Sequence, residues 1–125
     1  MLSKNSSISV EITGSFIQNK TSGGIYTESV QNFSMSNNTI TGNNSWGLQI
    51  HRTNALIDNN QISSNDNGLN VYSDPDRQTL VTLMNNQIVD NTNGSGIQVD
   101  HYGRVVANYN DIHGNSTDFQ NNTQV

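Results

Sequence analysis

The chain has 125 residues, of which 31% are hydrophobic and 12% charged, and its formal net charge is −5. This composition leaves little apolar surface for an ordinary compact core, and five Lys and Arg residues are too few to neutralise a nucleic-acid backbone, so we expect no nucleic-acid partner. The absence of Cys excludes disulfides and thiolate metal sites, and no run of about 18 apolar residues predicts a membrane span.

The first ten residues contain one Lys and no apolar run of signal-peptide length. Secretion would therefore require a signal on a larger parent chain. We expect a single segment of stacked β-strand coils over residues 1–125, with irregular ends at 1–8 and 120–125. Whether it is a fragment of a larger protein stays open.

One pattern recurs along the chain: Asn-Asn-x-Ile-x-x-Asn, a few turn residues, then Gly-apolar-x-apolar. An irregular first copy occupies residues 10–25. Clear copies follow at 37–50, 59–71 and 85–99, and a weaker one at 110–119. The central Ile recurs at 40, 62, 88 and 112, a period of about 24 residues. Such a fixed period is typical of a solenoid, whose coils bury apolar residues by stacking.

Apolar and polar residues alternate within each copy, as in Leu48-Gln49-Ile50, which predicts strands and no helix. We therefore predict an all-β fold, a single-stranded parallel β-helix of about five coils. Three inward columns should form its core. Their members are the four Ile residues, then Leu48, Leu69 and Ile97, then Ile50, Val71 and Val99.

Asn and Gly recur where the chain must turn. Asn tolerates left-handed backbone angles, and its amide can bond to the same residue one coil away. We interpret four such residues as a structural ladder: Asn43, Asn65, Asn91 and Asn115. Gly24, Gly47, Gly68 and Gly96 are expected to permit a tight corner before a strand.

Most charged, His and Tyr residues follow the second apolar residue of these strands. His51, Tyr72 and Asp100 should be neighbours on three coils, with Glu28 as the first-coil member. Phenols, amides and guanidinium groups suit the rings, hydroxyls and carboxylates of a polysaccharide. The candidate substrate-binding residues are His51, Arg52, Asp76, Arg77, Gln98, Asp100, Tyr102 and Arg104. The alternative is a solvated face whose charges pair among themselves.

Cofactors are not expected. Asp74, Asp76 and Asp100 offer oxygen ligands for Ca²⁺, but without the spacing of a known calcium loop.

At these residues the chain resembles the right-handed parallel β-helix proteins of the pectin-lyase-like superfamily. The segment Tyr72-Ser73-Asp74-Pro75-Asp76-Arg77-Gln78-Thr79, followed by Asp100 on the next coil, is similar to part of the mannuronan C-5 epimerases and alginate lyases. This resemblance implies a uronate polymer such as alginate as partner and an extracellular or cell-surface location. It assigns Tyr72 as the catalytic phenol and Asp74 as the carboxylate that orients the uronate.

The family's catalytic His is replaced here by Asp76, and its substrate-binding Lys has no counterpart. His101 or His51 would have to supply the imidazole. Three hypotheses follow: an epimerase or lyase with Tyr72, Asp74 and His101 as catalytic residues, a binding module without turnover, or a structural spacer of a surface, adhesin or phage fibre protein. Open coil ends also predict end-to-end self-association or a larger parent.

Overall fold

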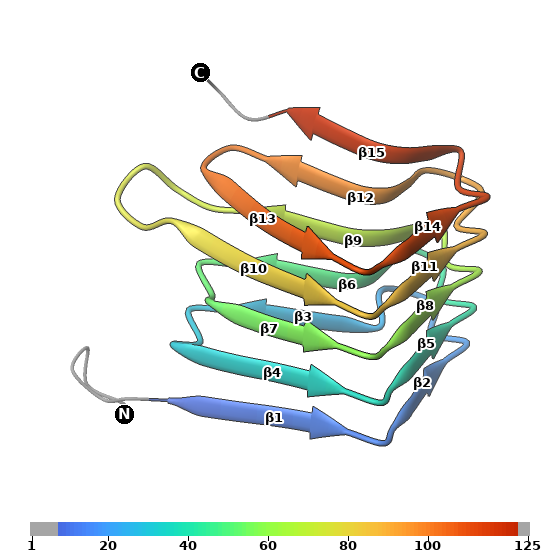
Figure 1. Ribbon diagram of the computed structural model, residues 1–125, viewed down its shortest axis with the longest axis horizontal. Coiled ribbons are helices and arrows are strands. Elements are labelled where there is room, and N and C mark those ends of the chain that lie inside the picture. Colours follow the sequence, from blue (N-terminus) through green and yellow to red (C-terminus); the bar gives the residue numbers. More distant parts are fainter. Residues whose placement is uncertain (1–7, 123–125) are drawn as a thin grey trace.

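The computed structural model describes residues 8–122, and within this range the chain forms strands and turns but no helix. Accordingly, no helix of the described chain is long and apolar enough to cross a membrane. The strands form three five-stranded sheets, and each coil contributes one strand to each sheet (Figure 1). We call them sheets A, B and C.

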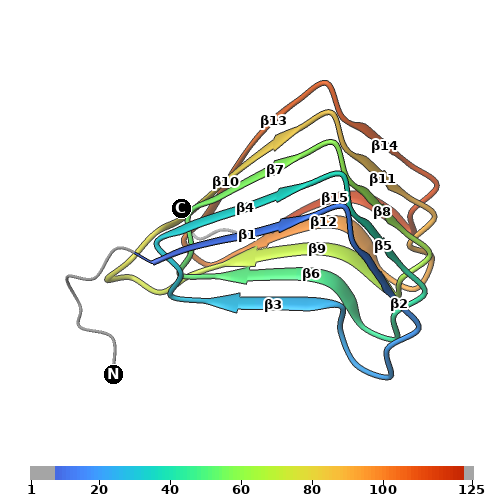
Figure 2. The ribbon, with the colours of Figure 1, turned by 90° about the horizontal axis from the view of Figure 1, so that it is seen from below.

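Sheet A contains β1 (Ser9–Thr13), β4 (Asn32–Ser36), β7 (Ala55–Asp58), β10 (Thr79–Met84) and β13 (Gly103–Asn108). Sheet B contains β2 (Phe16–Gln18), β5 (Thr39–Thr41), β8 (Gln61–Ser63), β11 (Gln87–Val89) and β14 (Asp111–His113). Sheet C contains β3 (Ile25–Glu28), β6 (Trp46–His51), β9 (Asn67–Tyr72), β12 (Ser95–Asp100) and β15 (Thr117–Asn122). All strand pairs are parallel, and the view along the stack shows a triangular cross-section (Figure 2). The predicted parallel solenoid of five coils is confirmed.

The predicted core columns are confirmed by the strand register. Ile40 pairs with Ile62, Leu48 with Leu69, and Ile50 with Val71. All six of these side chains are fully buried. Each column repeats at the strand spacing of about 4.8 Å, so every coil covers the apolar residues of the one before.

The core is larger than the three predicted columns, because sheet A supplies two more. One contains Phe33, Ala55 and Val81, and the other contains Met35, Ile57 and Leu83. The sequence pattern did not include these residues, since the strands of sheet A lie outside the recurring Asn-Asn-x-Ile segment. They complete the third wall of the prism.

Stacked Asn side chains close two corners of the prism. In the predicted ladder, Asn43 donates from its backbone N and its Nδ2 to Asn65 Oδ1, at 3.1 and 2.9 Å, and Asn65 repeats this with Asn91. A second ladder, not predicted, uses Asn38, Asn60, Asn86 and Asn110 in the same way. These buried amides are satisfied only by the neighbouring coils, so they fix the coil register.

The ladder Asn residues do not have the left-handed backbone that we predicted. Positive φ angles occur one residue earlier, for example at Ser64 (55°) and Asp90 (57°), and at Asn59 (54°) before the second ladder. The preceding residue makes the turn, which leaves the ladder Asn free to point its amide inward.

The Gly residues before the sheet C strands are also explained differently from our prediction. Gly47 lies inside β6, and its φ is not positive. A Cβ there would lie 2.7 Å from Asn65 Nδ2 of the next coil, and one at Gly24 would lie 2.5 Å from Gly47 O. These positions need Gly because coils approach closely beside the Asn ladder, and not because of a tight corner.

The expected irregular end at 120–125 is wrong for its first part. β15 continues to Asn122 because it pairs with β12, with Gln98 opposite Gln120 and Asp100 opposite Asn122. Residues 1–7 and 123–125 lie outside the described residues, so the expectation of irregular structure there remains a prediction.

Candidate functional site

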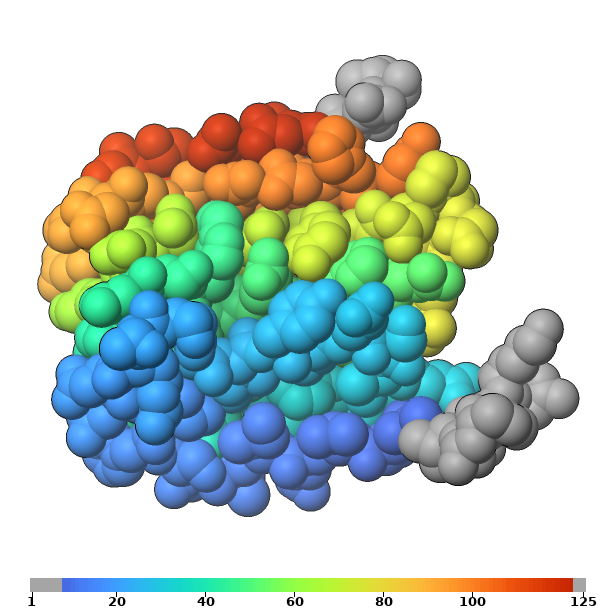
Figure 3. Space-filling model, turned by 180° about the vertical axis from the view of Figure 1, so that it is seen from behind, coloured from blue at the N-terminus to red at the C-terminus, as the bar shows by residue number. Residues whose placement is uncertain are grey.

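The outer face of sheet C carries the predicted functional residues in columns. One column contains Tyr26, Gln49, Asn70, Gln98 and Gln120, and the next contains Glu28, His51, Tyr72, Asp100 and Asn122. Figure 3 shows this face, with the yellow segment that follows β9 standing at one edge. Within the first column Asn70 is only 7% exposed, and its Oδ1 accepts no hydrogen bond from the described residues.

His51 is the centre of a cluster at the carboxyl ends of β3, β6 and β9. Its Nε2 lies 3.2 Å from Asp74 Oδ2, and its Nδ1 lies 3.7 Å from Glu28 Oε1. The ring stacks on Tyr72 with centroids 4.4 Å apart and an 8° interplanar angle. The His51 side chain is 12% exposed, so the pairing shields it on both nitrogens. We call Glu28, His51, Arg52, Tyr72, Asp74 and Asp76 the charged cluster.

Arg52 ties the loop after β9 to this cluster. Its Nη1 lies 3.3 Å from Asp74 Oδ2, and its Nη2 lies 3.5 Å from Asp76 Oδ2. Arg52 itself has a φ of 51°, a conformation that few side chains adopt, at the corner between sheets C and A. Its guanidinium therefore has two carboxylate partners, while its buried Nε donates to none of the described residues.

Tyr26 also contacts the charged cluster through its hydroxyl. The hydroxyl donates to Glu28 Oε2 at 3.2 Å and lies 3.5 Å from His51 Nδ1. A hydrogen bond with Tyr72 raises the pKa of Tyr26 far above its ordinary value, and partial burial and the nearby Glu28 carboxylate raise it further. The Tyr26 phenol is consequently held protonated, as a hydrogen-bond donor.

Gln98 and Asp100, both predicted to bind substrate, form a separate pair further up the stack. Gln98 Nε2 donates to Asp100 Oδ2 at 2.7 Å, and Asn122 Nδ2 donates to Asp100 Oδ1 at 2.8 Å. Both Asp100 oxygens thus accept hydrogen bonds from neutral amides.

The structure does not bring the remaining predicted residues into the charged cluster. The exposed His101 contacts this region through its backbone carbonyl, which accepts from Ser73 N at 2.8 Å. Among the described residues, the side chains of Arg77, Tyr102 and Arg104 make no hydrogen bond or ion pair with it. The imidazole that lies beside Tyr72 and Asp74 is that of His51, so the predicted grouping with His101 is not formed.

The three candidate Ca²⁺ ligands do not form a common site either. Asp74 and Asp76 face Arg52, while Asp100 is bonded to Gln98 and Asn122. Within residues 8–122 no three His, Cys, Asp or Glu side chains are grouped as a metal site would require. The suggestion of Ca²⁺ from these Asp residues finds no geometric support.

A hollow beside the charged cluster was missed by the sequence reasoning. Its volume is about 400 Å³, and it lies at the start of β3 and β6. The lining residues are Ser22, Gly23, Gly24, Ile25, Tyr26, Ser45, Trp46 and Gln49. We call it the Trp46 hollow. Trp46 carried a usable signal, since it is the only Trp of the chain and directly precedes a predicted strand.

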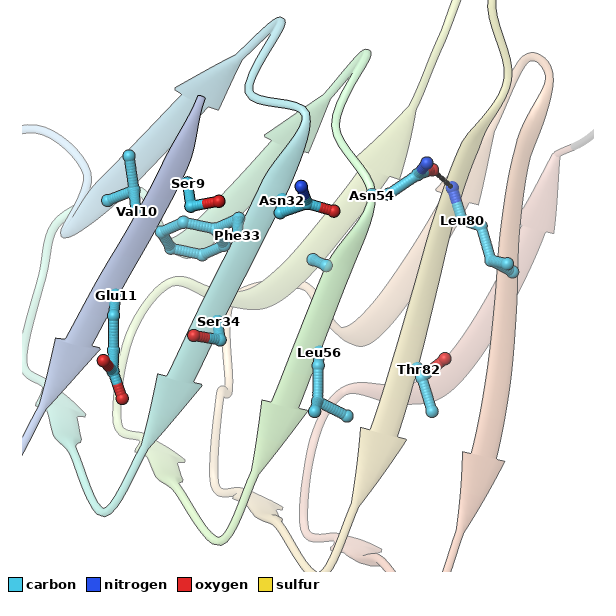
Figure 4. Close-up of a pocket in the computed structure, with 11 residues that line it drawn as sticks. Ser9, Val10, Glu11, Asn32, Phe33, Ser34, Asn54, Leu56, Leu80 and Thr82 are labelled. Carbon is cyan, nitrogen blue, oxygen red and sulfur yellow. Dashed lines mark hydrogen bonds between the residues drawn. The ribbon is translucent and has the colours of Figure 1, made fainter. Parts of the chain in front are cut away.

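A second hollow, of about 610 Å³, lies on sheet A (Figure 4). Its outward apolar residues Val10, Leu56 and Leu80 are 37%, 47% and 40% exposed, and Phe33 below them belongs to the core. Glu11 is its one charged lining residue. The lining is more apolar than that of the Trp46 hollow and places no exposed aromatic ring beside hydrogen-bonding groups, so it fits a sugar less well.

Comparison with known proteins gives one match. The family model described as "right handed beta helix region" matches residues 2–124, almost the whole chain. Neither the curated proteins nor the solved structures yield a match.

Proposed function

The chain belongs to the family of right-handed β-helix regions, and we propose that the outer face of its sheet C binds a carbohydrate chain. The interior of the β-helix is packed with side chains, so a ligand can bind only on an outer face. The observation that carries this proposal is the hollow where Trp46 and Tyr26 lie beside Gln49 and two Ser residues. Aromatic faces pack against sugar rings, and amides and hydroxyls exchange hydrogen bonds with sugar hydroxyls.

The amide column extends this binding surface across the coils. Gln49, Asn70 and Gln98 occupy equivalent positions on β6, β9 and β12. Gln49 and Gln98 stand two coils apart, about 10 Å at about 4.8 Å per coil, which is close to the length of two sugar rings, so an extended chain could meet both. Asn70 between them is buried. A polysaccharide is therefore a better partner than a single sugar.

The geometry favours binding without turnover. A catalytic phenol and carboxylate must reach the proton that they transfer. Here Tyr72 stacks on His51, while Asp74 faces both His51 and Arg52. An epimerase or lyase acting on uronate polymers would need these contacts to open, and we keep it as an outcome of the test.

A structural spacer is the second candidate. The charged cluster favours this second function, because the carboxylates, His51 and Arg52 of the cluster pair with one another. Such pairing is expected of a solvated face that binds no ligand. The Trp46 hollow distinguishes the two functions, since a spacer gives it no ligand.

Affinity electrophoresis in gels that contain neutral polysaccharides, alginate or pectin tests the proposal. We expect at least one polysaccharide to retard the wild-type chain, and the double variant Gln49→Ala/Gln98→Ala to lose this retardation. The matched control is Gln61→Ala/Gln87→Ala, which removes the same groups from the outer face of sheet B.

Four results would contradict the proposal or correct it. No retardation by any polymer favours the spacer. Unchanged retardation of Gln49→Ala/Gln98→Ala shows that the binding surface is not sheet C, and equal loss in both double variants shows that the loss is not specific to sheet C. Solvent deuterium at C-5, or unsaturated uronate products that disappear in Tyr72→Phe, would establish the enzyme.

A further inference from the structure

We infer that the Trp46 hollow takes an uncharged sugar residue and that the face around it rejects uronates. This inference rests on the proposed function and names its substrate class. The resemblance to epimerases led us to expect a uronate polymer as partner. The charges on the face of sheet C favour a neutral sugar instead.

The hollow contains hydrogen-bonding groups but no charge. Its polar side chains are those of Ser22, Ser45, Gln49 and the Tyr26 hydroxyl, and none of its lining residues is ionic at neutral pH. Gly23 and Gly24 are also lining residues, so part of the wall is backbone without side chains. A neutral sugar therefore loses only hydroxyl hydration, which these groups can replace.

A uronate would find no counter-charge there. Burying its carboxylate without a cation is costly, because charged groups are tolerated in such sites only when they are paired. The nearest cation in the charged cluster, Arg52, already contacts Asp74 and Asp76. Lys20 precedes the hollow by two residues, but it is not among the lining residues.

The neighbouring carboxylates add repulsion. Glu28 accepts from the Tyr26 hydroxyl at 3.2 Å, so a negative charge lies directly beside the ring that lines the hollow. Asp74, Asp76 and Asp100 lie further along the same face, where Arg52 contacts the first two and Arg77 follows in the same loop. The Debye length is about 10 Å at 0.1 M salt, so Glu28, the carboxylate that contacts Tyr26, disfavours an anionic polymer more than the carboxylates on later coils.

Because Trp46 is the only Trp, its fluorescence reports the hollow directly. We would titrate the chain with neutral β-1,4-linked hexasaccharides of glucose, mannose and xylose. Hexamers of mannuronate and galacturonate would be titrated in parallel, at low and at physiological salt. We expect a saturable emission change with a neutral hexamer and at least about tenfold weaker binding of every uronate hexamer, the gap narrowing as salt increases.

Variants locate the site by calorimetry. Trp46→Ala should weaken binding of the neutral hexamer at least about tenfold, and Trp46→Phe, which keeps an aromatic face, should weaken it only a few-fold. The matched control is Tyr109→Ala, which removes an 85% exposed aromatic ring between sheets A and B. Glu28→Gln should strengthen uronate binding relative to neutral binding.

The outcomes separate this inference from the proposed function. A uronate hexamer that binds as tightly as a neutral hexamer, or more tightly, overturns the inference but leaves the proposed carbohydrate-binding face. Loss of that uronate binding in Lys20→Gln would then identify Lys20 as the cation that pairs with the uronate. Neutral binding that survives Trp46→Ala overturns the hollow as the site. If no hexamer and no polysaccharide binds, the proposed function fails, and the inference fails with it.

Discussion

The outer face of sheet C presents two regions on the same strands that differ in how their polar groups are used. At the carboxyl ends, His51, Asp74 and Arg52 satisfy one another. At the amino ends, Trp46 and Gln49 line a hollow. Tyr26 joins the two, because its ring lines the hollow and its hydroxyl donates to Glu28. Charged residues that suggest catalysis in the sequence can thus serve to bind one another. The hydrogen-bonding groups that line a hollow lie a few residues away.

The largest loss of stability is expected from Asn65→Ala, which removes one residue of the Asn ladder that holds together the coils under both regions. Asn65 Oδ1 accepts from Asn43 N and Nδ2, and its Nδ2 donates to Ile40 O. Two buried donors and one acceptor lose their partner, at about 1–3 kcal/mol each, so we expect the free energy of unfolding to fall by about 3–5 kcal/mol.

Urea denaturation followed by circular dichroism measures this loss. The control is Asn44→Ala, an exposed Asn adjacent to the ladder, which should change the free energy of unfolding by less than about 0.5 kcal/mol. Equal values for the two variants would contradict the ladder's role in fixing the coils.

A smaller effect is expected from Arg52→Gln, which acts on the charged cluster alone. The variant keeps a long polar side chain but removes the positive charge between Asp74 and Asp76. Because both carboxylates are substantially exposed, the loss should be about 1 kcal/mol and should shrink at high salt.

Thermal unfolding at low and high salt checks this value, with Arg104→Gln as control, since Arg104 makes no ion pair among the described residues. The fluorescence titration of Trp46 with a neutral hexamer should be unchanged in Arg52→Gln. A loss of binding there would mean that the two regions are not independent.

The smallest effect concerns the Tyr26 phenol. Its raised pKa contributes stability that is present below about pH 10, the ordinary Tyr value, and is lost as the pH rises through the raised value. Removing the hydrogen bond in Tyr72→Phe should lower the pKa of Tyr26 toward the ordinary value.

Ultraviolet titration of the phenols in wild type, Tyr72→Phe and Tyr26→Phe tests this expectation. The Tyr26 phenol should ionise late in the wild-type chain, its signal should be missing from Tyr26→Phe, and its ionisation should move to lower pH in Tyr72→Phe. Unchanged ionisation of Tyr26 in Tyr72→Phe would contradict the hydrogen bond between the two phenols.

The sequence predicted the coils because each repeat places apolar residues and Asn at positions whose neighbours are the same residue types one coil away. Ile62, for example, lies between Ile40 and Ile88 on the neighbouring coils, so a period in the sequence becomes a column in space. The core columns of sheet A were not predicted in this way. Phe33, Ala55 and Val81 occupy one column but differ in size, and no motif links them in sequence.

The sequence was sufficient to predict which residues lie on the outer face of sheet C, but not which of their side chains contact one another. Alternation placed His51 and Tyr72 side by side, and the register confirms this. It could not reveal that Arg52 would reach the loop after β9, or that His101 would contact Ser73 only through its backbone, because those contacts depend on how an inserted loop folds. Trp46 was overlooked because the hollow forms only when residues 22–26 of another coil lie beside it.

The measurement that tests the central claim most directly is the perturbation of backbone and Trp46 indole NMR signals by a neutral hexasaccharide. We predict shifts centred on Trp46, Tyr26 and Gln49, extending along the face to Gln98, with small changes at Arg52 and Asp76. Shifts concentrated on the charged cluster, on sheet A near Leu56 and Leu80, or nowhere on the molecule would contradict the account.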